Sequence, residues 1–331
     1  MSKLNIPISI LNLVPIRAHS NAKEAVDQMT RLAQHAEQLG YKRYWIAEHH
    51  NAQNLVSSAT VLLMSHVLQH TNQIEVGSGG IMLPNHAPLI VAEQFGTLAT
   101  IYPDRVSLGL GRAPGTDMFT ASALRRDKHD GVYSFPKDIE QLLHYFGPEH
   151  EQGHVKAFPG VDTNVPIVVL GSSTDSAHLA ARLGLPYAFA SHFAPQQMKD
   201  AIQIYRNLFT PSKYLDKPYV MVGTNAIVAD TDEEAELLSH SMYQMFLSVI
   251  RNSRQPLSEP VEDLEAIWSP MEKQLALNFT TSSFIGSKES VKAQIEAFQE
   301  EFNADEFIVV SYIYDEQKQH YSYQLLKEIM Q

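Results

Sequence analysis

Short apolar runs, typical of buried strands, alternate along the chain with longer segments in which apolar residues recur every three or four positions. The first run covers residues 6–13. The segment after it predicts an amphipathic helix, because its apolar residues repeat with helical spacing from Ala25 to Leu39. Asn21 and Glu24 form a plausible capping box at its start, and Gly40 is suited to end it. This pattern indicates a helix that packs one face on a hydrophobic core.

The same alternation continues almost to the end of the chain. Seven further strands are predicted at residues 43–47, 74–79, 105–109, 167–170, 187–190, 220–228 and 307–311. Helical patterns lie between them at residues 57–70, 87–101, 175–183, 195–209, 231–250 and 287–302. A helix after each strand is typical of a parallel sheet. Eight such units in 331 residues favour a closed (β/α)₈ TIM barrel, with an open doubly wound sheet as the alternative.

Two stretches do not fit the repeat. Residues 125–136 are rich in charge, and residues 251–283 contain scattered Pro and Ser. We expect both to be excursions on the barrel surface, the second long enough to form a lid or a subunit contact, with plain solvated loops as the alternative. Length alone suggests about two domains. The repeat instead predicts that residues 1–331 form a single TIM-barrel domain with surface insertions.

Composition narrows the classes of partner and site. The chain has 37 acidic and 25 basic side chains, a formal net charge of −12, and no cysteine. Without cysteine there are no disulfides, thiolate metal sites or cysteine nucleophiles. The acidic balance without a basic block argues against nucleic acid, and no apolar run approaches the roughly 18 residues of a membrane span. The first residues lack a signal-peptide pattern, so we expect a cytoplasmic protein.

In a barrel of this kind, catalytic groups come from the carboxyl ends of the strands. The predicted second strand is followed by Glu48, His49, His50 and Asn51. Adjacent histidines on an extended segment point to opposite faces, so a shared metal ion is not expected. One imidazole can face the barrel mouth as a general acid or base, with Glu48 as its orienting partner. The alternative is that both histidines only hydrogen-bond the backbone.

Glycines follow the third predicted strand. Gly77, Gly79 and Gly80 permit a positive φ, the close approach of a flat ligand or a strained peptide, with a tight turn as the alternative. The dinucleotide-binding spacing fails, because Met82 stands where the third glycine belongs. It fails again after the fourth strand, where Pro114 takes that place. What remains there is Arg112, a permanent cation suited to a phosphate or a carboxylate.

After the fifth strand, Gly171, Ser172 and the residues up to Ser176 open a helix. Its amino-terminal N–H groups and hydroxyls are suited to binding an anion. Because this segment and Arg112 end neighbouring strands, we expect them to share one phosphate site. The alternative is that the hydroxyl side chains only cap the helix.

Four runs together resemble a known family. They are YWIAEHHN, VGSGGIMLPNHAPLIVAEQFGTL, VSLGLGRAPGTD and LGSSTDSAHLAARLGLPYAFASHF. In this order they resemble the bacterial luciferase-like flavin-dependent monooxygenases, and more closely the non-luminescent oxidoreductases among them. The similarity covers nearly the whole chain and is densest over residues 44–193.

The resemblance implies a (β/α)₈ barrel, usually dimeric, that binds FMN at the carboxyl ends of its strands. His49 matches the histidine that serves as acid or base beside the flavin. Gly79 and Gly80 match a non-prolyl cis peptide beneath the isoalloxazine ring, and Arg112 matches the arginine that binds the phosphate. The loop that completes the phosphate pocket matches Gly171, Ser172 and Ser176.

The implied activity is that of a monooxygenase that takes reduced FMN from a separate flavin reductase and uses dioxygen on a small organic substrate. Two alternatives stay open: hydride transfer with the deazaflavin F420, and a non-catalytic flavin-binding protein. Luminescent members commonly carry a cysteine at the flavin site, which this chain lacks. Light emission and a long-chain aldehyde substrate are therefore not expected.

Overall fold

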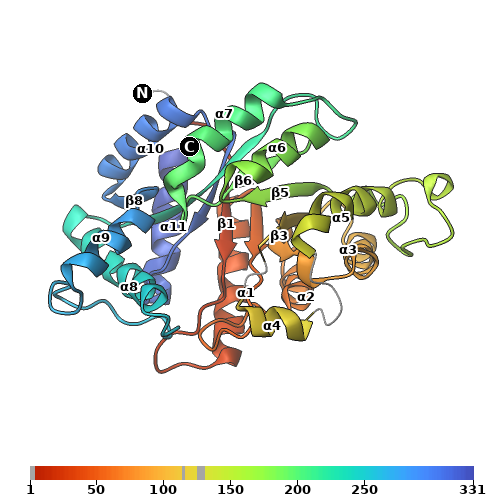
Figure 1. Cartoon of the computed structure of the whole chain (residues 1–331). Helices are drawn as coiled ribbons and strands as arrows, with labels where there is room; N and C mark the ends of the chain where they lie inside the picture. Colours follow the sequence, from red (N-terminus) through yellow and green to blue (C-terminus); the bar gives the residue numbers. More distant parts are fainter. Residues whose placement is uncertain (1–3, 114–115, 125–130) are drawn as a thin grey trace.

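Nine parallel strands form one sheet in the computed structural model, which describes residues 4–113, 116–124 and 131–331 (Figure 1). In chain order they are β1 (Ile8–Asn12), β2 (Arg43–Ile46), β3 (Glu75–Met82), β4 (Val106–Gly111), β5 (Ile167–Gly171), β6 (Tyr187–Phe189), β7 (Val220–Val228), β8 (Ser283–Gly286) and β9 (Glu306–Val310). Their side chains are mostly buried on both faces, as is usual where helices cover a parallel sheet.

Eight of these strands close into a barrel. β1 to β7 pair in sequence order, β7 pairs with β9, and β9 pairs with β1. The predicted (β/α)₈ barrel is therefore confirmed, and the open doubly wound sheet is wrong. All eight predicted strands are present. The additional strand, β8, pairs with β7 only at Asn225 and beyond, where the pairing with β9 ends.

Helices surround the barrel (Figure 1). They are α1 (Ala22–Leu39), α2 (Thr60–His70), α3 (Pro88–Ile101), α4 (Met118–Leu124), α5 (Gly131–Tyr145), α6 (Thr174–Leu183), α7 (Met198–Leu208), α8 (Asp232–Ile250), α9 (Pro270–Phe279), α10 (Lys288–Phe302) and α11 (Glu316–Met330). Across the described residues, none of these helices combines the length and the apolar character needed to cross a membrane. At the start of α1, Asn21 accepts from the backbone of Glu24, but the Glu24 carboxylate binds Arg31 instead of completing the capping box.

The two predicted excursions contain more structure than a surface loop. Residues 125–130 lie outside the described residues, and α5 begins directly after them. Residues 251–283 include α9, which packs against α8, and they end at β8. The interpretation of this second stretch as a plain solvated loop is therefore wrong. The helix in this stretch could not be recognised from the hydrophobic pattern, because its buried face is narrow and Pro, Ser and charged residues surround it.

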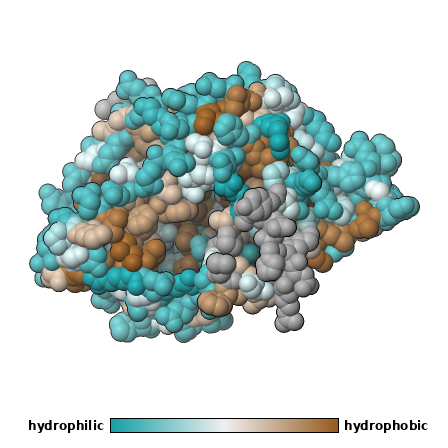
Figure 2. All heavy atoms as spheres, viewed as in Figure 1, coloured by the Kyte–Doolittle hydropathy of each residue, from teal (hydrophilic) through white to brown (hydrophobic). Residues whose placement is uncertain are grey.

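The barrel interior is filled by side chains that alternate with those facing the helices. Figure 2 shows the surface hollowed near the centre of the view, with hydrophobic residues in and beside the hollow. The interior residues belong to a cluster that continues into α8 and α9. Its members on the barrel strands include Leu11, Trp45, Val168, Ala188, Met221 and Ile308.

Candidate active site

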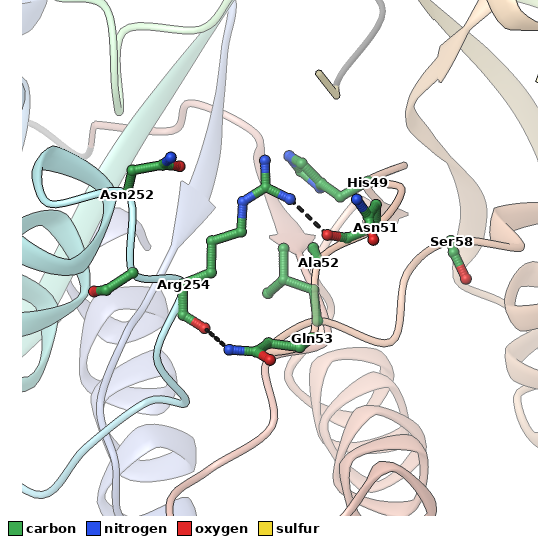
Figure 3. Close-up of a pocket in the computed structure, with 9 residues that line it drawn as sticks. His49, Asn51, Ala52, Gln53, Ser58, Asn252 and Arg254 are labelled. Carbon is green, nitrogen blue, oxygen red and sulfur yellow. Dashed lines mark hydrogen bonds between the residues drawn. The ribbon is translucent and has the colours of Figure 1, made fainter. Parts of the chain in front are cut away.

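A cavity of about 510 Å³ lies at the carboxyl end of β2, between the loop after this strand and the beginning of the 251–283 segment (Figure 3). The segment after α8 thus forms one wall of the barrel mouth. The cavity is lined by His49, Asn51, Ala52, Gln53, Leu55, Ser58, Asn252, Ser253 and Arg254.

His49 is the titratable side chain of this cavity. Its ring is largely buried, and Nδ1 has no hydrogen-bond partner among the described residues. Its backbone N–H donates to the carbonyl of Ser57 at 2.9 Å, which holds the loop in place. Burial lowers the pKa of His49 to about 4, although the charge of Glu48 opposes this. The imidazole is therefore neutral near pH 7 and has one unprotonated ring nitrogen.

Arg254 carries a fixed positive charge in the same cavity. Its Nη1 donates to the carbonyl of Asn51 at 2.6 Å, and Gln53 donates to the carbonyl of Arg254 at 3.5 Å. Figure 3 shows the guanidinium reaching across the cavity toward Asn51 and His49. Its charge is one of the smaller causes that lower the pKa of His49. The 251–283 segment thereby influences the proton affinity of the proposed acid/base.

Glu48 contacts His50, one of the two adjacent histidines, and His86 from the loop after β3. Its side chain is 1% exposed, and Oε1 accepts from His50 Nε2 and from His86 Nε2, each at 2.8 Å. Oε2 accepts the backbone N–H of Met82 at 3.2 Å. The prediction that Glu48 orients the acid/base is therefore wrong for His49, which points to the other side of the strand end.

The group of Glu48, His50 and His86 also has ligand atoms within 4.8 Å of one another, close enough for a metal ion. The observed contacts, however, have the length of ordinary N–H···O hydrogen bonds. Burial raises the pKa of Glu48, but the hydrogen bonds from the two histidines outweigh it and hold the pKa below its usual value. An ionised carboxylate that ties the β2 loop to the end of β3 accounts for this arrangement.

The Gly79–Gly80 peptide is cis, the geometry that the family resemblance implies. Both glycines are also required by the protein's own packing. A Cβ on Gly79 would lie 2.7 Å from the Leu11 side chain, and one on Gly80 would lie 2.6 Å from the carbonyl oxygen of Gly109. Close packing of β3 against its neighbours is therefore sufficient reason for glycine here, and a role beneath a flavin remains a prediction.

Arg112 and the beginning of α6 lie together, as the pairing of β4 with β5 requires. Arg112 Nη1 contacts Asp175 Oδ2 at 2.9 Å, and the two side chains are 35% and 65% exposed. This pairing could not be predicted from the sequence, where Asp175 is one of several polar residues at a helix start. The carboxylate occupies the arginine in the way an anionic ligand would.

The loop before α6 has features of an anion pocket. Ser173 is the N-cap residue, yet its side chain accepts no hydrogen bond from the first turn, so the capping alternative fails at this residue. Ser176 is buried, and a Cβ on Gly171 would collide with it at 2.5 Å. Ser172 is exposed at the mouth. Pro114 and Gly115, which belong to the predicted arginine loop, lie outside the described residues.

Two further buried polar residues lie at the same mouth of the barrel, and neither was predicted from the sequence. His192 follows β6 and Asn225 lies in β7. His192 lies near the end of the last of the four family-like runs, but no spacing marks it or Asn225 as a site residue. Only the closed barrel, which pairs β6 with β7, brings them together.

Comparison with known proteins assigns the chain to a family. The model for luciferase-like monooxygenases matches residues 6–304. A protein named luciferase-like monooxygenase from Escherichia coli (strain K12) is 43% identical over 329 residues, which cover 99% of this chain and 98% of the relative. An N-acetyl-S-alkylcysteine monooxygenase from Bacillus subtilis (strain 168) is 30% identical over 332 residues and covers 98% of both chains.

Solved structures agree. The crystal structure of apo-MsnO8 superposes with a TM-score of 0.86 at 30% identity, with 98% of both chains covered. At lower identity the likeness shows the fold alone. An oxygenating constituent of 3,6-diketocamphane monooxygenase from Pseudomonas putida, in complex with FMN, has a TM-score of 0.70 at 18% identity. An F420-dependent secondary alcohol dehydrogenase also has a TM-score of 0.70, at 15% sequence identity. The chain belongs to the luciferase-like monooxygenase family.

Proposed function

We propose that the chain is an FMN-dependent monooxygenase that receives reduced FMN from a separate flavin reductase and uses dioxygen to oxidise a small organic substrate. One observation carries this proposal: an arginine and the amino end of α6, whose N-cap side chain accepts no hydrogen bond from the first turn, lie together on neighbouring strand ends, at the mouth that also holds His49. This arrangement fits a ligand whose phosphate lies at the arginine and α6 and whose reactive group lies farther along the mouth, near His49.

The residues present fit FMN. Arg112 would hold the phosphate by charge, while Ser172 and the N–H groups of the first turn of α6 would donate to it. Ser176 packs against Gly171, and a side chain at position 171 would fill the space inside the loop. The bound reduced flavin would supply the electrons for dioxygen chemistry.

His49 would move the proton. It is neutral near pH 7 because burial lowers its pKa to about 4. Its unprotonated ring nitrogen can accept a proton during the reaction, although burial makes it a weaker base than a free imidazole. Arg254 and Asn252 face it across the cavity and would orient the polar part of a substrate. The hydrophobic cluster that continues from the barrel interior into α8 and α9 would exclude water.

Oxygen chemistry is favoured over F420-dependent hydride transfer by the relatives of higher identity. Both the 43% identical protein from Escherichia coli and the 30% identical protein from Bacillus subtilis are named as monooxygenases. The F420-dependent neighbour, at 15% identity, shares the fold alone. F420 remains the alternative cofactor, and a flavin-binding protein without turnover remains the non-catalytic alternative.

The proposal is tested by measuring the affinity of the purified protein for FMN and F420, each oxidised and reduced. We expect tightest binding of reduced FMN, and a preference for F420 would overturn the choice of cofactor. Oxygen consumption with reduced FMN should then differ between the intact protein and His49→Ala. Identical oxygen consumption and peroxide release in both would remove the proposed role of His49.

A flavin reductase is the proposed partner. A structural neighbour that binds FMN is described as an oxygenating constituent, which is the role of one protein in a two-component system. Adding a generic NADH-dependent flavin reductase should permit turnover without direct contact between the proteins. Failure to turn over with free reduced FMN, at concentrations that saturate binding, would contradict a diffusible cofactor.

We also propose that residues 1–331 act as one domain and form a homodimer. Three large apolar side chains are exposed on the neighbouring helices α2 and α3: Leu62 at 72%, Ile90 at 46% and Ile101 at 58%. Exposed apolar surface of this kind is costly to leave in water. A second copy of the chain would cover it.

A further inference from the structure

Two buried polar side chains on neighbouring strands lack hydrogen-bond partners at one atom each. His192, in the turn that follows β6, is 7% exposed, and Asn225 in β7 is 0% exposed. Among the residues that the structure describes, neither His192 Nδ1 nor Asn225 Oδ1 has a partner. A buried polar atom without a partner costs free energy, so these two atoms call for a ligand that supplies one.

Both side chains belong to the inside of the barrel mouth. Residues on a strand alternate between its two faces, so Gly223 and Asn225 share the face of Met221, which belongs to the interior cluster. A Cβ on Gly223 would lie 2.6 Å from His192 Nδ1. The imidazole therefore occupies the interior space that the missing side chain of Gly223 leaves open.

Hydrogen bonds within the protein hold this pair in place without a ligand. Asn225 Nδ2 donates to the carbonyl of His192 at 2.9 Å and to Ser283 Oγ at 3.1 Å. Ser191 Oγ donates to the carbonyl of Gly223 at 2.6 Å. With its amide nitrogen engaged on two partners, Asn225 has a fixed orientation and offers only its oxygen.

His192 also shares the mouth with His49. Burial lowers the pKa of His192 to about 4, and positive charge on His49 is the second cause. A neutral imidazole has one N–H and one unprotonated nitrogen. In the tautomer that carries its proton on Nδ1, His192 presents one hydrogen-bond donor beside the acceptor of Asn225.

We propose that His192 and Asn225 bind the pyrimidine edge of the flavin ring, with Asn225 Oδ1 accepting from the ring N3–H and His192 donating to an adjacent ring carbonyl. The inference rests on the proposed function, but not on the choice of cofactor, because FMN and F420 both carry an N3–H between two carbonyl groups. The phosphate residues end β4 and β5, and β6 and β7 come next around the mouth. The opposite, dimethylbenzene edge of FMN has no polar atom to satisfy this pair.

The test uses FMN and its N3-methyl derivative, which keeps the phosphate and both carbonyls but removes the N3–H. Dissociation constants for the unmodified protein are measured by flavin fluorescence. We expect N3-methylation to weaken binding roughly tenfold, the size of one buried hydrogen bond left unmade. His192→Phe, which keeps a planar ring against Gly223, should weaken FMN by a similar factor.

A matched control is available on α11. His320 also has a buried ring nitrogen without a partner among the described residues, and it stacks on His35 away from the mouth. His320→Phe should leave both dissociation constants unchanged. If the unmodified protein binds FMN and N3-methyl-FMN equally, or if His192→Phe leaves FMN affinity unchanged, the pair does not hold the flavin edge and the inference is overturned. If it binds neither FMN nor F420, the proposed function fails as well.

Discussion

Replacing Arg112 by Ala is the most informative single change at the proposed phosphate site. The guanidinium contacts Asp175, in the first turn of α6, at 2.9 Å. A hydrogen bond between charged groups contributes about 1.5 to 3 kcal/mol. Arg112→Ala should therefore weaken FMN binding by about 10- to 150-fold. Riboflavin has no phosphate, so its affinity should change much less.

Asp175→Asn should have the opposite effect. An ion pair between side chains that are 35% and 65% exposed contributes about 0 to 1 kcal/mol, so a phosphate dianion can displace it. Removing the carboxylate ends both its competition for Arg112 and its repulsion of the phosphate. FMN binding should become tighter by up to about fivefold, while riboflavin binding should not change.

The assay is a fluorescence titration of FMN and riboflavin with each variant, repeated at two salt concentrations because charge interactions weaken with salt. Arg182→Ala serves as the matched control, since Arg182 lies at the far end of the same helix in an exposed contact of 3.9 Å with Glu140. This control should leave FMN affinity unchanged. Equal losses of FMN and riboflavin affinity in Arg112→Ala would refute the reasoning, because Arg112 would then support the structure and not the phosphate.

Three further predictions concern the histidines and the assembly. Arg254→Gln should raise the pKa of His49, measured by NMR titration of the ring, and an unchanged value would separate Arg254 from the acid/base. Burial lowers the pKa of His192 and of His320 from 6.5 to about 4, so the unfolded chain binds more protons than the folded chain as pH falls. The free energy of unfolding, measured in urea, should therefore decline between pH 6.5 and pH 4. The decline should be smaller in His320→Phe. A stability that is the same at pH 7 and pH 5 would contradict this. Leu62→Glu should convert the proposed dimer to a monomer in light scattering, and a monomeric unmodified protein would rule the dimer out.

The barrel strands could be predicted because each is buried on both faces and appears as a continuous apolar run. β7, with all nine residues buried, is the clearest case. β8 could not be found, since it is four residues long and only two of these are fully buried. Similarly, α9 has one buried residue, Ala276, so its helical pattern is weak. A short element that packs on the outside of a closed barrel leaves little trace in the hydrophobic pattern.

The candidate site could be predicted only as far as the ends of the strands. The rule that barrels place chemistry at strand ends singles out Arg112 directly after β4 and the pair His49 and His50 shortly after β2. The choice of His49 from this pair rests on the family resemblance. The contacts of these residues were not predictable, because they join different loops. Glu48 contacts His86 from the loop after β3, and Arg112 contacts Asp175 after β5. Sequence spacing carries no information on such pairs.

The most direct test of the account is a crystal structure of the protein with FMN. The account predicts the phosphate on Arg112 and the first turn of α6, with Asp175 displaced from the guanidinium. It predicts the isoalloxazine ring against the Gly79–Gly80 peptide, within reach of His49. FMN bound away from the carboxyl end of the barrel, or a phosphate without contact to Arg112, would contradict the account.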